Sequence, residues 1–554
     1  MKPEPNIPYG ILSYFFKWEK ETPDAVFLKQ PFGDRWKEYT WRDTGIEARR
    51  ILAKIQQMQL PPGDKIGIWS ANCAEWIICD LALMMGGYVS VPLYANVNAE
   101  NLKGILLHAE CSLLLVGKID LKVWEKNKEA IPSHLPVLAM PGFQTKSPGL
   151  GEERSMPDIA QGKMVLPALD DLLTIIYTSG TTGAPKGVMH TYRTTISAVL
   201  AAREVVMIEQ PGNRFLSFLP LSHAAERGLV EFGAIYCGGS ISFVESVERF
   251  SATMQAVQPT HFLAVPRVWQ KFREGILEKI SPQRLELMLR IPFVSGFVKK
   301  RILTSLGLKK ARLILTGAAP ISIELLKWFH RLDIPIQEAY GLSEDFNVCS
   351  INPREDIRIG TVGKLVAGQE VKILPDTHEI IQRSGWIMKG YYKDPELNAK
   401  AIQDGYFYTG DMGDIVDGYL VITGRVKDIF KTTKGEYIAP FPIESHFLSM
   451  NEIDQACVLG SRYAQPFIVV VLSKQGKEID KALLERKLKS TLDRCNHDSM
   501  GFQQLKKVII VKEEWTAENG ILTLTMKMKR NVVARLYEEK LEAKYATEPS
   551  VSWE

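Results

Sequence analysis

Short apolar runs alternate with longer amphipathic segments along most of the chain. Runs rich in β-branched and aromatic residues predict strands over 214–220, 260–266 and 311–317. The segment "ISIELLKWFHRL" at 321–332 instead repeats its apolar positions every three or four residues, which predicts a helix. Strands and helices that alternate in this way are typical of layers built on mostly parallel sheets. We therefore expect an α/β fold.

The length of the chain implies more than one domain. It has 554 residues, whereas one domain usually has about 100–200. After Gly424 the sequence becomes more charged. We expect a large N-terminal α/β domain with several subdomains over residues 1–424, and a small mobile α+β domain over 425–554. The stretch from Met140 to Asp170 is rich in proline, glycine, serine and charge, and it predicts a surface connection.

Composition excludes several classes of protein. The net charge of +4 is nearly balanced and gives no argument for nucleic-acid binding. The seven cysteines are scattered without a CxxC pair, which indicates reduced thiols and no zinc site. The first ten residues lack the apolar core of a signal peptide. The most apolar window, 76–94, contains Asp80 and two glycines and is too interrupted to span a bilayer. We expect a cytoplasmic protein.

The stretch "IIYTSGTTGAPKG" at 175–187 combines a buried strand with a loop rich in glycine and hydroxyl groups. Glycines allow close backbone approach, and successive backbone N–H groups can line an anion site. Lys186 adds a positive charge, so the pattern predicts a phosphate-holding loop. A Walker-type loop is excluded because Lys186 is followed by Gly187 instead of serine or threonine.

This loop resembles the phosphate loop of the adenylate-forming superfamily, which comprises acyl-CoA synthetases, luciferases and peptide-synthetase adenylation domains. Further motifs follow in the order of that family. They are "LPLSHAAERG" at 219–228, "TGAAP" at 316–320, "QEAYGLSE" at 337–344, "DGYFYTGD" at 404–411, "GRVKDIFKTTKGEYIAP" at 424–440 and "NGILTLTMKMKR" at 519–530. The first of these, together with "PTHFLAVPRVWQKF" at 259–272 and "KGEYIAP" at 434–440, is similar to the long-chain acyl-CoA synthetase branch.

The resemblance implies a reaction in two halves with ATP, Mg²⁺ and coenzyme A. A carboxylate attacks the α-phosphorus of ATP and expels pyrophosphate, and the thiol of coenzyme A then displaces AMP from the acyl adenylate. The residues that the resemblance places around ATP and AMP are Thr178, Ser179, Gly180, Thr181, Thr182, Gly183, Lys186, Gly317, Ala318, Ala319, Pro320, Tyr340, Gly341, Ser343, Asp411 and Arg425.

Among these, the resemblance gives several side chains separate tasks. Glu344 is similar to the carboxylate that helps to hold magnesium, with the Thr181 hydroxyl as a second ligand. Tyr340 resembles the aromatic residue that packs on adenine. Asp411 has the position of the carboxylate that binds both ribose hydroxyls, and Arg425 that of a nucleotide-contacting arginine.

Three residues are expected to act around the reacting atoms or between the two halves. Lys527 resembles the lysine that bridges the incoming carboxylate and the α-phosphate, with Lys529 as the alternative if the register differs. His223 is similar to a histidine near the acyl carboxylate, although a structural role is an equal alternative. The family rotates its small domain about a hinge, here Lys427, and Gly435 would then line the pantetheine path of coenzyme A.

Several positions bear on the substrate and on departures from the family. Relatives that activate amino acids carry an aspartate in the motif at 219–228, whereas this chain has no carboxylate there before Glu226. An apolar acyl chain is therefore expected. Ser343 replaces the usual threonine, Asn398 replaces a frequent threonine, and Leu524 replaces a proline, which would loosen the turn that presents the lysine.

Residues 290–312 hold seven basic side chains and no acidic one, with apolar residues between them. Such a segment can lie on an anionic membrane surface, so peripheral contact with the inner face of a membrane is one interpretation. An ordinary solvated helix is another, and contact with the 3′-phosphate of coenzyme A is a third.

The resemblance and the apolar acyl chain expected above predict the function of a long-chain fatty acid–CoA ligase. Two other enzymes remain open: a fatty acyl–AMP ligase that passes the acyl group to a carrier protein, and a CoA ligase for medium-chain or aryl acids. A binding protein without catalysis is disfavoured because Lys186, Glu344, Asp411, Arg425 and Lys527 are all present.

Overall fold

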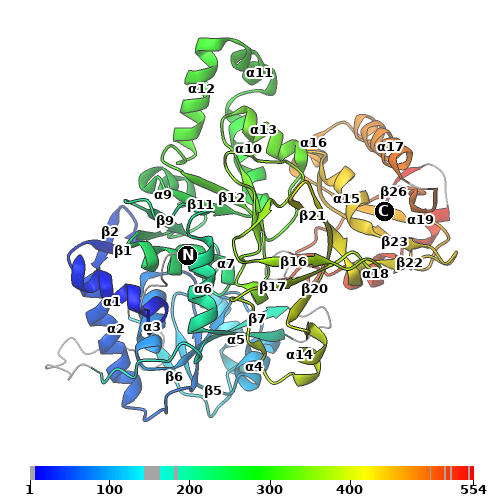
Figure 1. The fold of residues 1–554 in the computed structure, drawn as a ribbon. Coiled ribbons are helices and arrows are strands. Elements are labelled where there is room, and N and C mark those ends of the chain that lie inside the picture. Colours follow the sequence, from blue (N-terminus) through cyan, green and yellow to red (C-terminus); the bar gives the residue numbers. More distant parts are fainter. Residues whose placement is uncertain are drawn as a thin grey trace.

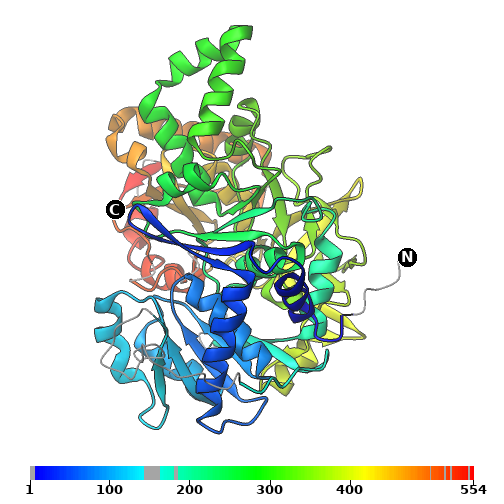
Figure 2. The ribbon, with the colours of Figure 1, turned by 90° about the vertical axis from the view of Figure 1, so that its left-hand side faces the viewer.

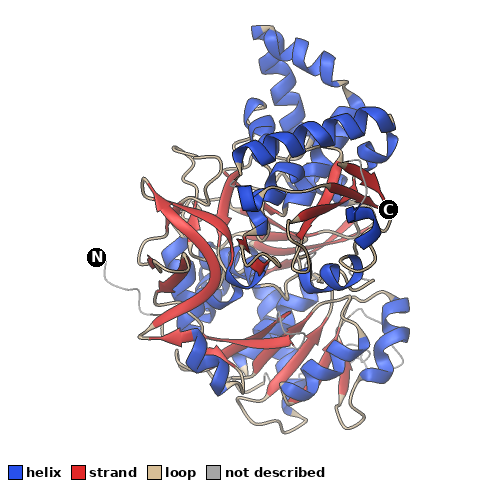
Figure 3. Cartoon of the chain, turned by 90° about the vertical axis from the view of Figure 1, so that its right-hand side faces the viewer, coloured by secondary structure: helices blue, strands red, loops and turns tan. Residues whose placement is uncertain are grey.

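The fold has a large N-terminal part that contains two extensive sheets and a smaller C-terminal part that packs against it (Figure 1). The computed structural model describes residues 7–141, 162–179, 185–499, 501–516, 519–523, 527–546 and 550–554. Helices cover the faces of the sheets (Figure 3), as the alternation of strands and amphipathic segments predicts. The expected α/β class is confirmed.

The first sheet carries the strands that hold much of the site. Its central strands β1, β10, β9, β11, β12 and β13 are parallel, and antiparallel strands close both edges. In spatial order its strands are β15 (Lys364–Leu365), β14 (Ser350–Ile351), β13 (Gln337–Tyr340), β12 (Leu313–Thr316), β11 (His261–Ala264), β9 (Arg214–Ser217), β10 (Ser240–Phe243), β1 (Val26–Phe32) and β2 (Arg35–Thr40).

The second sheet packs beside the first and is buried on both faces. Its strands β7, β4, β3, β5 and β6 are parallel, whereas β8 and β18 are antiparallel to their neighbours. Continuous apolar runs such as "CSLLLV" suit a strand with no solvated face. In spatial order the strands are β18 (Gly390–Tyr391), β8 (Pro185–Thr191), β7 (Leu172–Ser179), β4 (Val89–Leu93), β3 (Lys65–Trp69), β5 (Cys111–Val116) and β6 (Val137–Ala139).

The helices of the large part form where local capping and amphipathic spacing favour them. Thr40 and Asp43, for example, make a capping box that starts α2. The α-helices are α1 (Ile11–Glu21), α2 (Trp41–Gln56), α3 (Ala74–Met85), α4 (Ala99–His108), α5 (Leu121–Asn127), α6 (Tyr192–Ala202), α7 (Ala224–Glu226), α8 (Gly233–Cys237), α9 (Phe250–Val257), α10 (Pro266–Lys279), α11 (Pro282–Arg290), α12 (Pro292–Ser305), α13 (Ile323–Arg331) and α14 (Pro395–Ala401).

An antiparallel sheet leads from the large part towards the C-terminal part. It contains β16 (Glu370–Ile373), β17 (Glu379–Arg383), β20 (Tyr406–Val416), β19 (Ile402–Gln403) and β21 (Tyr419–Arg425). The short strands β22 (Phe430–Lys431) and β23 (Tyr437–Ile438) follow it as a two-stranded ribbon. Short 3₁₀ turns lie at Lys128–Ala130, Ser343–Asp345, Val426–Asp428 and Gly501–Gln503.

The C-terminal part is built on a mixed sheet with helices on both faces. Alternate residues of "FIVVVL" in its second strand enter two separate apolar cores, one on each face. Its strands are β24 (Ile453–Leu459), β25 (Phe467–Leu472), β26 (Val508–Val511) and β27 (Val551–Trp553). Its helices are α15 (Pro440–Leu448), α16 (Lys474–Glu478), α17 (Lys481–Asp498), α18 (Arg530–Tyr537) and α19 (Glu542–Ala546).

The sequence expectations for local structure fare well. The three strand predictions correspond to β9, β11 and β12, and the helix prediction at 321–332 to α13. The segment at 227–239 contains a π-helix, Arg227–Phe232, which continues into α8. Of the expected connection from Met140 to Asp170, residues 142–161 lie outside the described residues. The domain boundary at 424/425 stays a prediction.

Candidate active site

The phosphate loop joins two antiparallel strands. β7 runs to Ser179 and β8 begins at Pro185, with Thr178 opposite Lys186 in the register. Four of the expected phosphate-holding residues, Gly180, Thr181, Thr182 and Gly183, lie outside the described residues. The hairpin geometry differs from a Walker loop, in which a strand passes directly into a helix, because α6 begins only at Tyr192.

Lys186 lies at the start of β8, and its side chain points towards Tyr391 of the neighbouring strand β18. Its ammonium lies 5.3 Å from the ring centre of Tyr391. Burial and the positive charge of Lys427 lower the pKa of Lys186, and the carboxylates of Glu344 and Asp394 oppose that effect. The structure therefore brings together the lysine of the loop, the expected magnesium carboxylate and the expected hinge lysine.

Two further motifs follow neighbouring parallel strands and meet at one edge of the first sheet. Gly317 follows β12, and Tyr340 ends β13, which pairs directly with β12. Ala318 has a φ of 65°, a left-handed backbone conformation that aims the loop over this edge. A side chain at Gly341 would overlap the backbone of Asn347, so only glycine lets the two segments touch. Ala319 and Pro320 lie exposed in the same loop.

Asp411 is held from two sides. Tyr340 donates its hydroxyl hydrogen to Oδ2 of Asp411 at 2.8 Å, and Nε of Arg425 lies 2.8 Å from Oδ1. Asp411 and Arg425 face each other across the β20–β21 pair. The Asp411 carboxylate raises the pKa of Arg425 against the effect of burial. The three expected nucleotide contacts thus form one connected group.

Glu344 lies in the 3₁₀ turn Ser343–Asp345 beside the phosphate hairpin. Its carboxylate accepts a hydrogen bond from the Tyr391 hydroxyl at 2.8 Å. The turn is anchored from below by His190, which donates from Nε2 to the Ser343 carbonyl oxygen at 2.7 Å. Burial lowers the pKa of His190 to about 4, so this ring is neutral at physiological pH.

Lys527 reaches this group from the C-terminal part. Burial lowers the pKa of Lys527, the charge of Arg425 lowers it further, and Asp411 and Glu344 act in the opposite sense. Its backbone N–H donates to Oγ1 of Thr523 at 3.0 Å. The charge of Lys527 is therefore coupled to the carboxylates of Asp411 and Glu344. Its choice over Lys529 as the reacting lysine stays a prediction. Leu524, the residue of the loosened turn, lies outside the described residues.

His223 stands between the lysine and an apolar cavity. The backbone N–H of Ala225 donates to its Nδ1 at 3.2 Å, so the neutral ring carries its proton on Nε2. Burial and then the positive charge of Lys527 lower the pKa of His223 to about 4. The histidine caps α7, which is a structural role, and it also lines the cavity. Its expected place near the acyl carboxylate stays a prediction.

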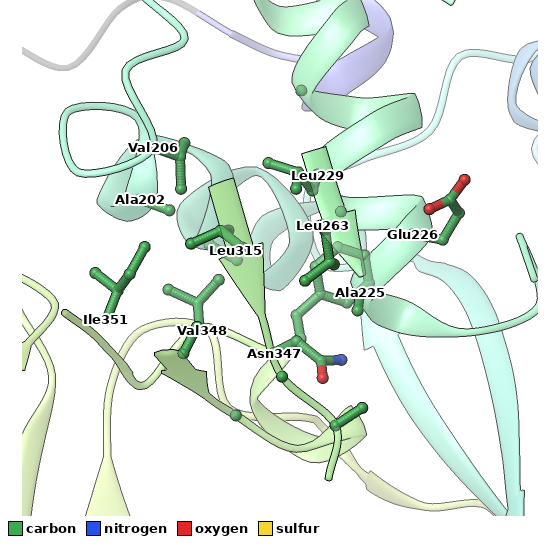
Figure 4. A pocket seen from close by; sticks show the side chains of 18 of the residues that line it. Ala202, Val206, Ala225, Glu226, Leu229, Leu263, Leu315, Asn347, Val348 and Ile351 are labelled. Carbon is green, nitrogen blue, oxygen red and sulfur yellow. The ribbon is translucent and has the colours of Figure 1, made fainter. Parts of the chain in front are cut away.

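The cavity has a volume of about 260 Å³ and mostly apolar walls (Figure 4). Apolar side chains from α6, α7, the π-helix, β11, β12, β14 and the loops beside them form these walls. Those labelled in Figure 4 are Ala202, Val206, Ala225, Leu229, Leu263, Leu315, Val348 and Ile351. His223, Gly317, Ala318, Tyr340 and Gly341 line the same cavity. The apolar walls and residues of the expected nucleotide motifs thus border one space.

Lys427 borders this group through its charge effect on Lys186, whereas Gly435 stands apart from it. Lys427 lies in the 3₁₀ turn directly after β21, and its role as a hinge stays a prediction. Gly435 is exposed, with a φ of 90°, in the turn between β22 and β23. Among the described residues, only the Lys431 side chain lies within 4 Å of a Cβ built at Gly435. The structure does not bring it to the cavity.

Sequence reasoning missed several side chains of the site. Tyr391 and His190 position Glu344 and its turn, and neither is among the site residues expected from the sequence. Glu338 precedes Tyr340 by two residues; burial raises the pKa of its carboxyl to about 7. Its Oε2 has no hydrogen-bond partner within the described part of the chain. Its place inside "QEAYGLSE" was the available signal.

Comparison with known families decides the classification. The profile described as AMP-binding enzyme matches residues 15–392, which is more than half of the chain. The chain belongs to the AMP-binding enzyme family. The profile described as AMP-binding enzyme C-terminal domain matches residues 427–549. These two matches confirm the resemblance to adenylate-forming enzymes. Together with the relatives described next, they confirm the long-chain branch.

Relatives of this AMP-binding enzyme extend over most of its length. Long-chain-fatty-acid–CoA ligase FadD15 of Mycobacterium bovis is 28% identical over 590 residues, covering 97% of either chain. Long-chain-fatty-acid–CoA ligase 5 of Rattus norvegicus is 30% identical and covers 87% of this chain and 80% of its own. ATP-bound MatB from Rhodopseudomonas palustris superimposes with a TM-score of 0.75 at 22% identity, over 97% and 100% of the two chains, which shows the shared fold.

Proposed function

We propose that this protein is an AMP-forming acid–thiol ligase that activates a long-chain fatty acid with ATP and transfers the acyl group to coenzyme A. The observation that carries the proposal is the apolar cavity of about 260 Å³ that His223, Gly317 and Tyr340 also line. Family membership supports the AMP-forming chemistry, and relatives named long-chain-fatty-acid–CoA ligases at 28–30% identity support the choice of acid.

The first half-reaction requires negative groups to approach each other. The carboxylate oxygen of the acid attacks the α-phosphorus, and pyrophosphate leaves with the electrons of the broken P–O bond. We assign to Lys527 the neutralisation of the carboxylate and α-phosphate at this moment, since a compact ammonium suits that task. His223 is neutral and presents Nε2–H, so it can donate to an acyl oxygen without adding charge.

The nucleotide is proposed to lie across the edge formed by β12 and β13. Tyr340 would pack against adenine, with the backbone of Gly317 to Pro320 nearby. Asp411 still has unused acceptor positions on both oxygens for two ribose hydroxyls. Lys186 and the hairpin backbone would hold the β- and γ-phosphates.

Glu344 would help to hold a magnesium ion, with Thr181 as the second expected ligand. Within the described part of the chain, no group of three or more His, Cys, Asp and Glu side chains is placed to hold a metal. One carboxylate fits magnesium, which takes most of its ligands from phosphates and water. When bound, the ion would stabilise charge on the phosphate oxygens.

The second half-reaction places a different demand on the same space. The thiol of coenzyme A attacks the acyl carbon, a thioester bond forms, and AMP leaves. Lys527 occupies the space beside His223 in this structure, and Gly435 is remote. We propose that rotation about Lys427 withdraws Lys527 and brings Gly435 to the site, where a glycine leaves room for pantetheine.

Product analysis tests the proposal directly. ATP, magnesium and palmitate are incubated with the protein, with and without coenzyme A, and the products are followed by mass spectrometry. Palmitoyl-CoA and AMP that form only with coenzyme A support the proposal. Palmitoyl-AMP without thioester indicates transfer to a carrier protein instead. No turnover with fatty acids, but turnover with aryl or shorter acids, contradicts the long-chain assignment.

We also propose that the protein acts in the cytoplasm and contacts a membrane peripherally. In the part of the chain that the structure describes, no helix is long and apolar enough to cross a bilayer. A contact with the membrane would use surface residues.

A further inference from the structure

Helices α11 and α12 form a hairpin that projects from the large part, as three views of the molecule show (Figures 1, 2 and 3). The turn between them, around Ile291, is the far end of this projection. The base of the hairpin joins the apolar core of the first sheet through Leu285, Val298 and Ile302. The hairpin is therefore a folded extension of the core.

The outer face of α12 carries aromatic side chains in solvent. Phe293 is 95% exposed, and Phe297, one helical turn later, is 65% exposed. Val298 and Ile302 fill the inward face of the helix, so these phenylalanines are not needed for packing. On α11, Leu287 is 63% exposed. Large apolar side chains gathered at the tip of a projection are typical of an interaction surface.

Basic side chains flank this apolar tip on the side towards the base of the hairpin. Lys300 and Arg301 follow Phe293 by seven and eight residues and therefore share its helix face. Both are exposed, and no ion pair involves either one within the described residues. Over residues 282–301 the hairpin has five basic residues and one acidic residue, Glu286. Glu286 already pairs with Arg290 and Arg331, and Lys299 pairs with Asp333.

We propose that the tip of the α11–α12 hairpin docks on the surface of a bilayer that contains anionic lipids. Phe293, Phe297, Leu287 and Ile291 would enter the interface, and Arg284, Lys300 and Arg301 would face the lipid phosphates. Charge complementarity favours this occupant, because apolar insertion and basic attraction act together at an anionic membrane surface. The proposed docking depends only on the exposed side chains of the hairpin. Its benefit, the uptake of fatty acid from the bilayer, rests on the proposed function.

Co-sedimentation with lipid vesicles tests the docking without ATP, coenzyme A or fatty acid. Vesicles are made of equal parts of phosphatidylglycerol and phosphatidylcholine, or of phosphatidylcholine alone. We expect binding to the anionic vesicles and at most weak binding to the neutral ones. F293S/F297S should lose about tenfold or more of the affinity. K300Q/R301Q should lose about 25-fold at low salt, since each charge near such a surface contributes about fivefold.

Matched variants elsewhere on the surface are the controls. L121S/V247S removes two apolar side chains that are also highly exposed, and R486Q/K489Q removes an exposed Arg–Lys pair from α17. Both should bind vesicles like the wild type. Unchanged melting temperatures would show that the hairpin variants fold.

Four results overturn the proposal. The first is that the hairpin variants bind anionic vesicles like the wild type, and the second is that the wild type binds neutral vesicles equally well. The third is that the wild type binds neither kind of vesicle. The fourth is that the tip mediates self-association of the protein, measured by size-exclusion chromatography. A rise in the KM for coenzyme A in K300Q/R301Q without loss of vesicle binding would assign these charges to that substrate. Because vesicle binding needs no turnover, a protein that docks but does not make thioester would contradict only the proposed function.

Discussion

Tyr340 donates its hydroxyl hydrogen to Oδ2 of Asp411 across 2.8 Å, and so ties the end of β13 to β20. Nε of Arg425 lies 2.8 Å from the other carboxylate oxygen, Oδ1 of Asp411. Asp411 is only 4% exposed, so its orientation is fixed before any ligand arrives. A carboxylate has about four acceptor positions, and these two bonds leave one free on each oxygen. That arrangement suits two adjacent hydroxyl groups.

Asp411→Asn should therefore raise the KM for ATP by about tenfold or more, because an amide offers a single acceptor atom and loses the pairing with Arg425. Tyr340→Phe should have a smaller effect, since the ring remains and only the orienting bond is lost. KM for ATP is measured by pyrophosphate release with palmitate. Asp414→Asn, on the same strand but paired with His378 at the surface, is the control. Equal KM values for the Asp411 variant and wild type would contradict the assignment.

Lys527→Ala should slow formation of the acyl adenylate by about 10²–10³-fold, while ATP binding is retained. The reason is that Lys527 is coupled in charge to Arg425, Asp411 and Glu344. The rate is measured by ATP–pyrophosphate exchange and the binding by calorimetry. Lys529→Ala, two residues away, should change the exchange rate little. If Lys529→Ala were the slower variant, the register of the catalytic lysine would be wrong.

Ala202→Phe should shift the preferred acid towards shorter chains. Ala202 lines the cavity from the end of α6 (Figure 4), and the larger side chain fills part of its 260 Å³. We expect kcat/KM for palmitate to fall about tenfold or more, since each lost apolar contact weakens binding, and kcat/KM for octanoate to stay within about twofold. Ala202→Ser keeps the volume and is the control. An equal loss for both acids would separate this cavity from acyl binding.

Glu226 makes stability depend on pH. Burial raises the pKa of its carboxyl from 4.5 to about 8, although hydrogen bonds from Ser217 and the Phe218 backbone oppose the shift. Below pH 4.5 the carboxyl is protonated in the folded and the unfolded chain. As the pH rises from about 4.5 to about 8, the unfolded chain loses this proton and the folded chain keeps it, so the folded state loses stability.

Glu226→Gln should consequently raise the melting temperature at pH 8 and change it little at pH 4.5. The neutral amide keeps an oxygen that can accept from the Phe218 N–H, and it removes the cost of holding a buried acid protonated. The gain at pH 8 is on the order of a few kcal/mol. Thermal unfolding at a series of pH values measures it. A difference between variant and wild type that is constant with pH would refute the raised pKa.

The sequence predicts more of the fold than of the site. The parallel strands β9, β11 and β12 are predictable because fully buried strands read as short apolar runs between turn residues. The π-helix at 227–232 is not, since an amphipathic pattern does not distinguish an α-helix from a local insertion of one residue. The charged residues of the candidate site stand inside motifs that resemble those of the family, which is why the sequence offers them, and their roles stay predictions.

The supports of the site could not be found in this way. Tyr391 lies 47 residues from Glu344, and His190 lies 153 residues from Ser343. The pairing of β18 with β8 places Tyr391 beside Val188, and hydrogen bonds from the His190 ring and the Met388 N–H then hold the Ser343–Asp345 turn. The walls of the cavity are equally hidden, because they come from helices and strands spread over residues 198–366. Each of these residues looks like ordinary core until the strands are placed.

Arg227 offers the sharpest test of what holds the cavity wall in place. It lies in the π-helix, is fully buried, and pairs with Asp80 and with Glu231, the latter at 3.2 Å. It also donates to Thr174 Oγ1 at 2.7 Å and Ser90 Oγ at 3.0 Å, which ties the π-helix to β7 and β4. Burial and the neighbouring Asp80 raise the pKa of Glu231 well above its ordinary value, so Glu231 is held protonated and Arg227 balances Asp80.

Arg227→Ala should therefore cost about 3–5 kcal/mol, because it leaves the Asp80 carboxylate buried without a counter-charge. Glu231→Gln should cost far less, since it replaces a group that is already neutral. Arg50→Ala, at an exposed pair with Glu47, should cost less than about 1 kcal/mol. Thermal unfolding by circular dichroism ranks the three variants. If Glu231→Gln destabilised the protein as much as Arg227→Ala, then Glu231 would carry its charge in the core, and Arg227 would be shared between two carboxylates instead of balancing one.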